Sequence, residues 1–285
     1  MPGTLYVVAT PIGNLEDVTL RALRILREVS VIAAEDTRRT ARILQHSSIS
    51  TRTTSLHEHN ERSKAPLLIA RLKAGDSVAL VSDAGTPVVS DPGSALVAAA
   101  HSAGIRVEPV PGPSAVVAAL SACGFPEQGF SFLGFPPVRA SARKRLFERV
   151  AAEPRTLVFY EAPHRIRACL RDMLDVFGDR ELLIGRELTK VHEILVVRPI
   201  SVHLAEALEE RGEFTLVLRG STQRSTGRTE GNEDLDPATL VLEFGELTKK
   251  DDLDRRAALM ELARRHQLSR KAVYSLIERG KKSVK

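Results

Sequence analysis

Short apolar runs alternate with helical segments along the first 120 residues, and this rhythm constrains the fold more than any other feature of the sequence. The runs are typical of buried strands and lie at residues 5–9, 31–36, 77–81 and 105–112. Strands that alternate with helices are typical of a mostly parallel, doubly wound sheet. From about residue 130 the runs follow one another more directly, which indicates a mixed sheet. We therefore predict an α/β chain with two sheets.

Changes of rhythm and composition suggest where the chain divides. We predict an N-terminal α/β domain at 1–120, a mixed α/β domain at 121–220, a flexible linker at 221–237 and a helical extension at 238–285. The linker has no apolar run and is rich in Ser, Thr, Gly and charged residues.

The basic charge of the chain is concentrated in the extension. Residues 238–285 contain 12 Lys and Arg against 7 Asp and Glu, a surplus of +5 that equals the formal net charge of the whole chain. We predict two helices here, one at 253–266 and one from Ser269, with Arg270 and Lys271 at the basic turn between them. Such a hairpin suits contact with a polyanion, although a solvated pair of basic helices has the same composition.

Composition argues against membrane and secreted proteins. The sequence has no run of about 18 consecutive apolar residues, the length that spans a membrane. The N-terminus lacks the basic region of a signal peptide. Cys123 and Cys169 show no metal-ligand spacing, so we expect free thiols in a reducing compartment. We therefore expect a cytoplasmic protein without membrane contact and without a metal site.

Three loops rich in Gly and Pro each follow a predicted strand. They are TPIGN at 10–14, SDAGTP at 82–87 and PGPS at 111–114. In an open parallel sheet, ligands bind outside the carboxyl ends of the strands, and glycine lets the backbone approach a ligand closely. Any one loop is as readily an ordinary tight connection, but three at one edge predict a composite pocket.

The charge of these loops limits the ligand. No dinucleotide or P-loop fingerprint is present, and the stretch SDAGTPVVSDPG holds Asp83 and Asp91 without a Lys or Arg. A pyrophosphate would be repelled by these carboxylates. A ligand with hydroxyls and a positive centre fits better, and S-adenosylmethionine has both.

Eight motifs point to a known family. TPIGNLED, AEDTRRT, SLHEHN, VSDAGTPVVSDPG, PVPGPSA, YEAPHRI, GRELTKVHE and GEFTLVL follow one another in this order. Their order and spelling resemble the small-subunit ribosomal RNA cytidine-2′-O-methyltransferases of the tetrapyrrole-methylase superfamily. The resemblance covers residues 4 to about 219, and the basic hairpin at 240–285 is similar to the family's C-terminal extension.

The resemblance implies a fold, a reaction and partners. The fold is the two-domain, tetrapyrrole-methylase-like (class III methyltransferase) α/β fold, with a cleft between the domains and a small C-terminal helical hairpin. The cofactor is S-adenosylmethionine. The reaction methylates the 2′-hydroxyl of a cytidine in the 16S rRNA of the small ribosomal subunit, in the decoding region. The family works as a homodimer.

The same resemblance implies the residues of a cofactor pocket. They come from the three loops and from the strand that ends at YEAP, and are Pro11, Gly13, Asp83, Gly85, Thr86, Gly112, Ser114, Ala115 and Tyr160. Asp83 either anchors the ribose hydroxyls or the ammonium group of the cofactor, or only holds the shape of its loop.

Transfer from an activated sulfonium needs mostly positioning, with a proton acceptor for the sugar hydroxyl. We select Glu161, His57 and Asp36 as catalytic candidates, while Glu35, His59 and Glu187 remain alternatives. The histidines are as readily structural hydrogen-bonding residues. Glu161 could equally orient its loop by pairing with Arg165, and the reaction could need no acid or base at all.

Basic residues after strand ends could contact the RNA backbone. We predict this role for Arg38, Arg165, Arg186 and Lys190, together with Arg270 and Lys271 of the extension. Phosphate contacts of this kind fix position rather than read sequence. With 4% aromatic residues, base stacking on an aromatic platform is not expected.

Two other functions are compatible with parts of the sequence. A methyltransferase acting on a tetrapyrrole precursor would use the same loops, but the basic extension and YEAPHR argue against it. A ribosome-binding protein without enzymatic activity would use the extension as an anchor, and the intact loops argue only weakly against this.

Overall fold

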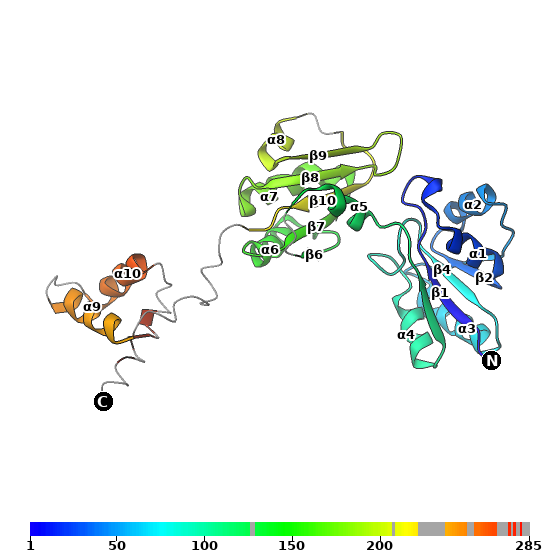
Figure 1. Ribbon diagram of the computed structural model, residues 1–285, viewed down its shortest axis with the longest axis horizontal. Coiled ribbons are helices and arrows are strands. Elements are labelled where there is room, and N and C mark those ends of the chain that lie inside the picture. Colours follow the sequence, from blue (N-terminus) through cyan, green and yellow to red (C-terminus); the bar gives the residue numbers. More distant parts are fainter. Residues whose placement is uncertain are drawn as a thin grey trace. The chain divides into compact units, whose positions relative to one another are not determined.

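The computed structural model describes residues 1–125, 129–206, 209–221, 237–249, 254–266, 273, 274, 276, 277 and 280. The chain forms two compact units, one made of Met1–Ala151 with Arg155–Gly220 and the other of Ala152–Pro154 with Ser221–Lys285 (Figure 1). None of the described helices is both long and apolar enough to cross a membrane. Most of the predicted linker, together with Ser269, Arg270 and Lys271, lies outside the described residues.

The first sheet of the larger unit is parallel throughout, as predicted. Its strands lie in the order β3-β2-β4-β1-β5. They span β1 Thr4–Val8, β2 Val31–Ala34, β3 Thr53–Ser55, β4 Val78–Val81 and β5 Arg106–Val110. Every residue of β2 and β4 is buried, because helices cover both faces of a doubly wound sheet. Leu5 belongs to the core on one face and Val8 to the core on the other.

Helices connect these strands. They are α1 Leu20–Glu28, α2 Thr37–His46, α3 Glu61–Lys73, α4 Ser94–Ser102 and α5 Ala115–Ala122, with a 3₁₀ turn η1 at Leu15–Asp17. Side-chain caps fix two of the starts: the Ala22 N–H donates to Thr19 Oγ1 at 3.0 Å, and the Arg38 N–H donates to Asp36 Oδ1 at 2.8 Å. The apolar pattern did not indicate α2, because the helix buries only Thr40, Ile43 and Leu44.

The second sheet is mixed, which confirms that prediction. Its order is β6-β7-β10-β8-β9, with β6 parallel to β7 and the other pairs antiparallel. The strands are β6 Phe130–Phe132, β7 Thr156–Glu161, β8 Glu181–Arg186, β9 Ile194–Pro199 and β10 Phe214–Leu218. The helices are α6 Ala140–Val150, α7 Ile166–Phe177 and α8 Ile200–Ala205, with a 3₁₀ turn η2 at Pro163–Arg165.

Helix α5 joins the two sheets within the larger unit. It follows the last strand of the first sheet, but its buried residues Val116 and Ala119 pack against Val158 and Val217 of the second sheet. Ile12 of the first loop and Leu188, which follows β8, belong to the same apolar cluster. The loops of the first sheet are therefore held against the second sheet by a shared core.

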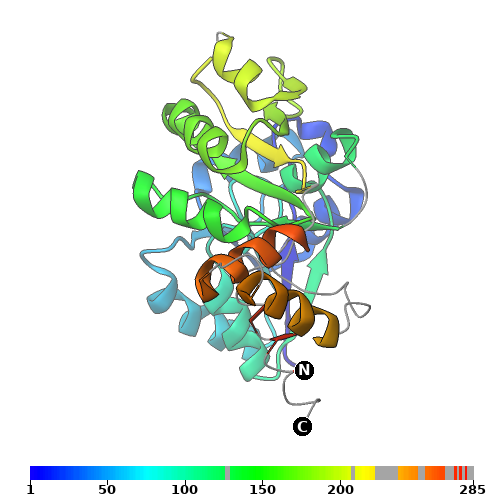
Figure 2. The ribbon, with the colours of Figure 1, turned by 90° about the vertical axis from the view of Figure 1, so that its left-hand side faces the viewer.

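The smaller unit contains α9 Pro237–Lys249 and α10 Arg255–Arg265, which lie side by side (Figure 2). Leu240 and Leu247 of α9 pack on Ala258 and Leu262 of α10, and Val273 completes this core with Ile277. Helix α10 confirms the prediction of a helix at 253–266. The prediction missed α9, whose run TLVLEF is equally typical of a strand.

Candidate active site

The three glycine-rich loops meet at the carboxyl edge of the first sheet. Strands β4, β1 and β5 are neighbours and parallel, so the loops that follow them emerge together. The Thr10 N–H donates to the Gly85 carbonyl at 2.8 Å and the Gly85 N–H donates back at 3.0 Å. Thr86 Oγ1 donates to the Pro113 carbonyl at 3.3 Å. The expectation of one composite edge is confirmed.

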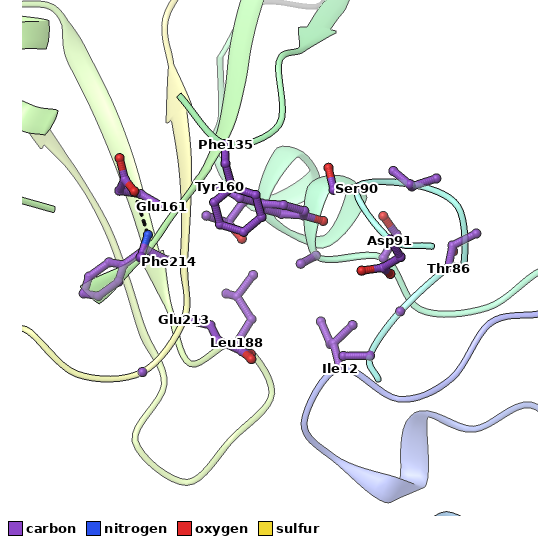
Figure 3. A pocket seen from close by; sticks show the side chains of 18 of the residues that line it. Ile12, Thr86, Ser90, Asp91, Phe135, Tyr160, Glu161, Leu188, Glu213 and Phe214 are labelled. Carbon is purple, nitrogen blue, oxygen red and sulfur yellow. Dashed lines mark hydrogen bonds between the residues drawn. The ribbon is translucent and has the colours of Figure 1, made fainter. Parts of the chain in front are cut away.

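A cavity of about 340 Å³ lies where these loops face the second sheet (Figure 3). This volume is within the usual range for small-molecule sites. One wall consists of Ile12, residues 84–86, residues 89–91 and the start of α5. The opposite wall consists of Phe135, residues 160–163, Leu188 and residues 212–215. Both halves of the larger unit therefore contribute to one site.

The predicted cofactor residues divide into two groups. Five of them line the cavity: Gly85, Thr86, Ser114, Ala115 and Tyr160. The other four lie in the loops that frame it but are not in its lining: Pro11, Gly13, Asp83 and Gly112. Their contact with a cofactor stays a prediction.

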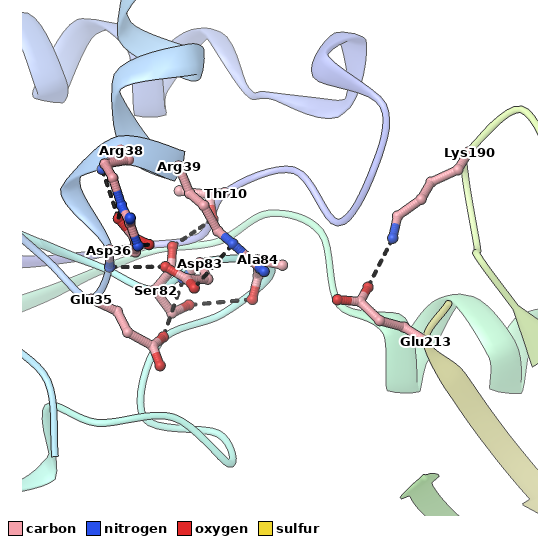
Figure 4. A network of polar contacts seen from close by, with 10 residues as sticks. All are labelled: Thr10, Glu35, Asp36, Arg38, Arg39, Ser82, Asp83, Ala84, Lys190 and Glu213. Carbon is pink, nitrogen blue, oxygen red and sulfur yellow. Dashed lines mark hydrogen bonds and ion pairs between the residues drawn. The ribbon is translucent and has the colours of Figure 1, made fainter. Parts of the chain in front are cut away.

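Asp83 holds neighbouring loops together. Its Oδ1 accepts the Asp36 N–H at 2.9 Å, and its Oδ2 lies 3.5 Å from Arg39 Nε (Figure 4). The Asp83 N–H donates to Glu35 Oε2 at 3.3 Å. These contacts tie the end of β4 to the end of β2. They favour the loop-holding alternative for Asp83 over direct contact with a ligand.

Gly13 allows the loop after β8 to approach the loop after β1. A Cβ atom on Gly13 would lie 2.5 Å from Lys190 Cγ, 2.7 Å from Thr189 Oγ1 and 2.9 Å from the Leu188 carbonyl oxygen. The Asn14 N–H donates to Thr189 Oγ1 at 2.9 Å. Leu188 lines the cavity, so this close approach sets the position of one of its walls.

The three catalytic candidates have different surroundings. Glu161 lines the cavity, but its fully buried side chain accepts the Ala162 N–H at 2.7 Å and lies 3.1 Å from Arg165 Nε. Asp36 lies outside the cavity lining, and its hydrogen bonds with Arg38 hold the pKa of that carboxyl well below its usual range, which disfavours a role as base. His57 also lies outside the lining, and its Nε2 lies 3.1 Å from Asn60 Nδ2.

Asp91 is a cavity residue that the sequence did not distinguish from Asp83. Burial raises its pKa, the negative charge of Asp83 adds to this rise, and a hydrogen bond with Ser82 opposes it. Glu35, whose carboxylate accepts the Asp83 N–H, also has a raised pKa, with burial as the main cause. The only signal in the sequence was the second carboxylate of SDAGTPVVSDPG.

The predicted RNA contacts are mostly engaged within the protein. The side chains of Arg165 and Arg186 are only 15% and 6% exposed, in ion pairs with Glu161 and Glu209. Lys190 Nζ binds both Glu187 at 2.8 Å and Glu213 at 3.0 Å. Arg38 is well exposed although it pairs with Asp36. Among these four, Arg38 has the surroundings most suitable for an RNA phosphate.

In the described part of the chain, no group of three or more His, Cys, Asp or Glu side chains is arranged to hold a metal ion.

Tyr160 is predicted to remain protonated at all physiological pH values. Burial, with the nearby charge of Asp91, raises the pKa of Tyr160 to about 12. Absorbance titration of the phenolate should therefore show one tyrosine that ionises about two pH units above the usual value near 10. The Tyr160→Phe variant should lose that step alone. A high-pH step that persists in the variant would contradict this assignment to Tyr160.

Comparison with known proteins agrees with this arrangement. Residues 4–202 match the family model of the tetrapyrrole (corrin/porphyrin) methylases. The chain is 47% identical over 276 residues to ribosomal RNA small subunit methyltransferase I of Vibrio cholerae, covering 95% of this chain and 92% of that protein. It is 51% identical to the protein of the same name from Pseudomonas aeruginosa, over 76% of this chain and 79% of that one.

The fold is also that of solved methyltransferases. The crystal structure of uroporphyrin-III C-methyltransferase from Thermus thermophilus complexed with S-adenyl homocysteine superimposes with a TM-score of 0.55 at 20% identity, covering 75% of this chain and 96% of that chain. These likenesses, over most of the length of both partners, establish that the chain is a methyltransferase of the tetrapyrrole methylase family and belongs, within that family, with the ribosomal RNA small subunit methyltransferase I proteins.

Proposed function

We propose that the protein transfers a methyl group from S-adenosylmethionine to the 2′-hydroxyl of a cytidine in the 16S rRNA of the small ribosomal subunit, in the decoding region. The observation that carries this proposal is the 47% identity with the V. cholerae protein across nearly the whole of both chains. The order of motifs from TPIGNLED to GEFTLVL supports the cytidine 2′-hydroxyl as the acceptor.

The cavity has a lining that suits S-adenosylmethionine. Gly85, Thr86, Ser114, Ala115 and Tyr160 offer backbone groups and hydroxyls for the ribose and adenine. Asp91 lines the same space without an ion-pair partner among the described residues, which favours a ligand with a positive centre over one with a phosphate. The ligand would supply a methyl group already activated on a sulfonium.

The protein's main contribution to such a transfer is positioning. The two walls of the cavity come from different sheets, and their shared apolar cluster keeps the distance between them fixed. Holding donor and acceptor in line in this way removes much of the entropic barrier of a bimolecular reaction. The exposed Arg38 and the basic extension would position the RNA through its phosphates.

The resemblance also implies a homodimer, and we include this in the proposal. We further propose that the protein acts in the cytoplasm, where its substrate is located. An apolar surface supports self-association: Ile194, Leu195 and Val197 of the edge strand β9 are 37–40% exposed. Exposed apolar residues on an edge strand commonly mark an interaction surface.

One labelling experiment separates the proposed function from its alternatives. The protein is incubated with methyl-labelled S-adenosylmethionine and with free rRNA, assembled small subunits or a tetrapyrrole precursor. Label on a ribose of the rRNA supports the proposal. Label on the tetrapyrrole favours the pigment methyltransferase. Binding to small subunits without any label favours a non-enzymatic ribosome-binding protein.

The extension is predicted to contribute electrostatic affinity for RNA. Replacing both Arg270 and Lys271 with glutamine should make the salt dependence of subunit binding shallower by about 1–2 units of log K per log salt, because about two phosphate contacts are lost. The measurement is a binding titration at several salt concentrations. A slope equal to that of the wild type would contradict an anchoring role for these residues.

A further inference from the structure

Three carboxylates line the cavity, and two of them form an ion pair with a neighbouring cation. Glu161 lies 3.1 Å from Arg165 Nε and its side chain is fully buried. Glu213 Oε2 lies 3.0 Å from Lys190 Nζ. Both are on the side of the second sheet (Figure 3). Neither is therefore free to bind an incoming proton without breaking an ion pair.

The third carboxylate, Asp91, has a different environment. Among the described residues, no Lys, Arg or His lies within ion-pair distance of it. It lies on the opposite wall of the cavity, in the loop after β4 (Figure 3).

The backbone of this loop is unusual, because Val88 and Ser90 adopt φ values of 73° and 66°. A β-branched residue with positive φ is rare and costs free energy, and such strain is common at functional sites.

The other polar groups of the cavity are poor proton acceptors. In the described part of the chain the lining contains no histidine. The hydroxyls of Thr86, Ser90, Ser114 and Thr215 are not basic at neutral pH. The Tyr160 hydroxyl stays protonated because its pKa is raised to about 12. By elimination, Asp91 is the acceptor that remains.

We propose that Asp91 is a catalytic residue that accepts the proton of the attacking ribose hydroxyl. This rests on the proposed function. As the bond between the hydroxyl oxygen and the methyl carbon forms, the bond between that carbon and the sulfonium sulfur breaks. The sulfur keeps the electron pair and becomes a neutral thioether. The hydroxyl proton passes to the Asp91 carboxylate and from there to water, so charge and atoms balance.

The charges around Asp91 favour this role. Burial is the main cause that raises the pKa of Asp91 above its ordinary value, the negative charge of Asp83 adds to this rise, and a hydrogen bond with Ser82 opposes it. Arg39 faces Asp83 rather than Asp91, and Tyr160 is uncharged. From the far wall, Glu161 and Glu213 are already paired. A base whose pKa is shifted towards the working pH is more effective than an ordinary aspartate.

The test is Asp91→Asn in the full-length protein. We expect kcat for methyl transfer to small subunits to fall about 100-fold, in line with the usual contribution of a general base. The Kd for S-adenosylhomocysteine, measured by calorimetry, should change less than about threefold. The rise of kcat with pH that the wild type shows as Asp91 loses its proton should disappear. The melting temperature should not fall, because asparagine removes a half-buried charge and keeps an oxygen that can accept the hydrogen bond from Ser82.

Glu213→Gln is the matched control, since it neutralises another carboxylate of the same cavity. We expect a decrease in kcat of less than about tenfold, with the pH profile retained, because Glu213 is not the proton acceptor in this mechanism. If Asp91→Asn does not fold, Asp91→Glu replaces it. That variant keeps a displaced acceptor, so kcat should fall about tenfold while its rise with pH remains.

Three results would overturn the assignment. If the kcat of Asp91→Asn stays within about threefold of the wild-type value, Asp91 is not the proton acceptor. The same follows from an Asp91→Glu variant in which the rise of kcat with pH is lost. A Kd for S-adenosylmethionine raised tenfold or more, with kcat restored at saturation, makes Asp91 a counter-ion of the cofactor instead. No transfer by the wild type overturns the proposed function itself, and this inference with it.

Discussion

Replacement of Asp172 by leucine is expected to lower the free energy of unfolding by about 3–5 kcal/mol. Arg143 and Asp172 are both buried, and Arg143 Nε donates to Asp172 Oδ2 at 2.8 Å. Removing the carboxylate leaves a guanidinium in the interior without a full countercharge. Loss of one partner of a buried pair costs much more than the pair itself contributes.

The same interaction supports a wall of the cavity. Arg143 Nη1 donates to the carbonyls of Pro137 at 3.3 Å and Val138 at 3.1 Å, and Arg165 donates to the Pro136 carbonyl. These bonds hold the segment that follows Phe135, a cavity residue. We therefore expect Asp172→Leu also to weaken cofactor binding at temperatures where the protein is still folded.

Urea unfolding of matched variants tests this prediction, because it measures the free energy of unfolding of each variant. Asp175→Leu is the control, because Asp175 lies on the same helix and pairs with Lys144 at the surface, where such a pair contributes less than about 1 kcal/mol. The double variant Arg143→Met with Asp172→Leu should recover most of the lost stability, since it leaves no buried charge. Equal unfolding of Asp172→Leu and Asp175→Leu would contradict the account.

Replacement of Gly13 by alanine is expected to raise the Kd for S-adenosylmethionine at least tenfold. The added Cβ would lie 2.9 Å from the carbonyl oxygen of Leu188 and 2.7 Å from Thr189 Oγ1. The side chain of Lys190 can move aside, but the backbone of Leu188 moves only with its loop. Because Leu188 is part of the cavity lining, a shift of this loop changes the shape of the site. Displacements of about 1 Å are enough to reduce function strongly.

Gly245→Ala is the matched control for this glycine. A Cβ on Gly245 meets no atom within 4 Å, and the residue lies inside helix α9. Alanine there should stabilise the smaller unit by about 1 kcal/mol and leave cofactor affinity unchanged. Calorimetric titration of both variants compares them. Unchanged affinity in Gly13→Ala would show that the loop after β8 does not shape the cofactor site.

The alternation of apolar runs was sufficient to predict four of the five strands of the first sheet and the mixed second sheet, because buried parallel strands such as β2 and β4 consist almost entirely of apolar residues. It missed the edge strand β3, whose sequence TTS contains no apolar residue. It was insufficient for α2, whose sequence TRRTARILQH covers the sheet with three residues only. It also missed α9, where Gly245 and the run TLVLEF lower the helical signal, although Leu240, Phe244 and Leu247 have helical spacing.

For the site, the sequence indicated which loops would meet but not which carboxylate would face the cavity. Asp83 and Asp91 lie in one motif, and Val88 and Ser90 between them adopt positive φ values. No periodic pattern in the sequence predicts such backbone conformations. The ion pair between Arg186 and Glu209 could not be predicted from the sequence either, because it depends on how close the two side chains lie in the folded protein.

We propose that this cavity serves methylation of a ribose in the small-subunit RNA. The most direct test is mass spectrometry of nucleosides from small subunits that lack the modification, after incubation with the protein and S-adenosylmethionine. We expect one new 2′-O-methylcytidine per subunit, formed by the wild type and strongly reduced with Gly13→Ala at limiting cofactor. A methyl group on a base instead of a ribose, or no methylated nucleoside at all, would contradict it.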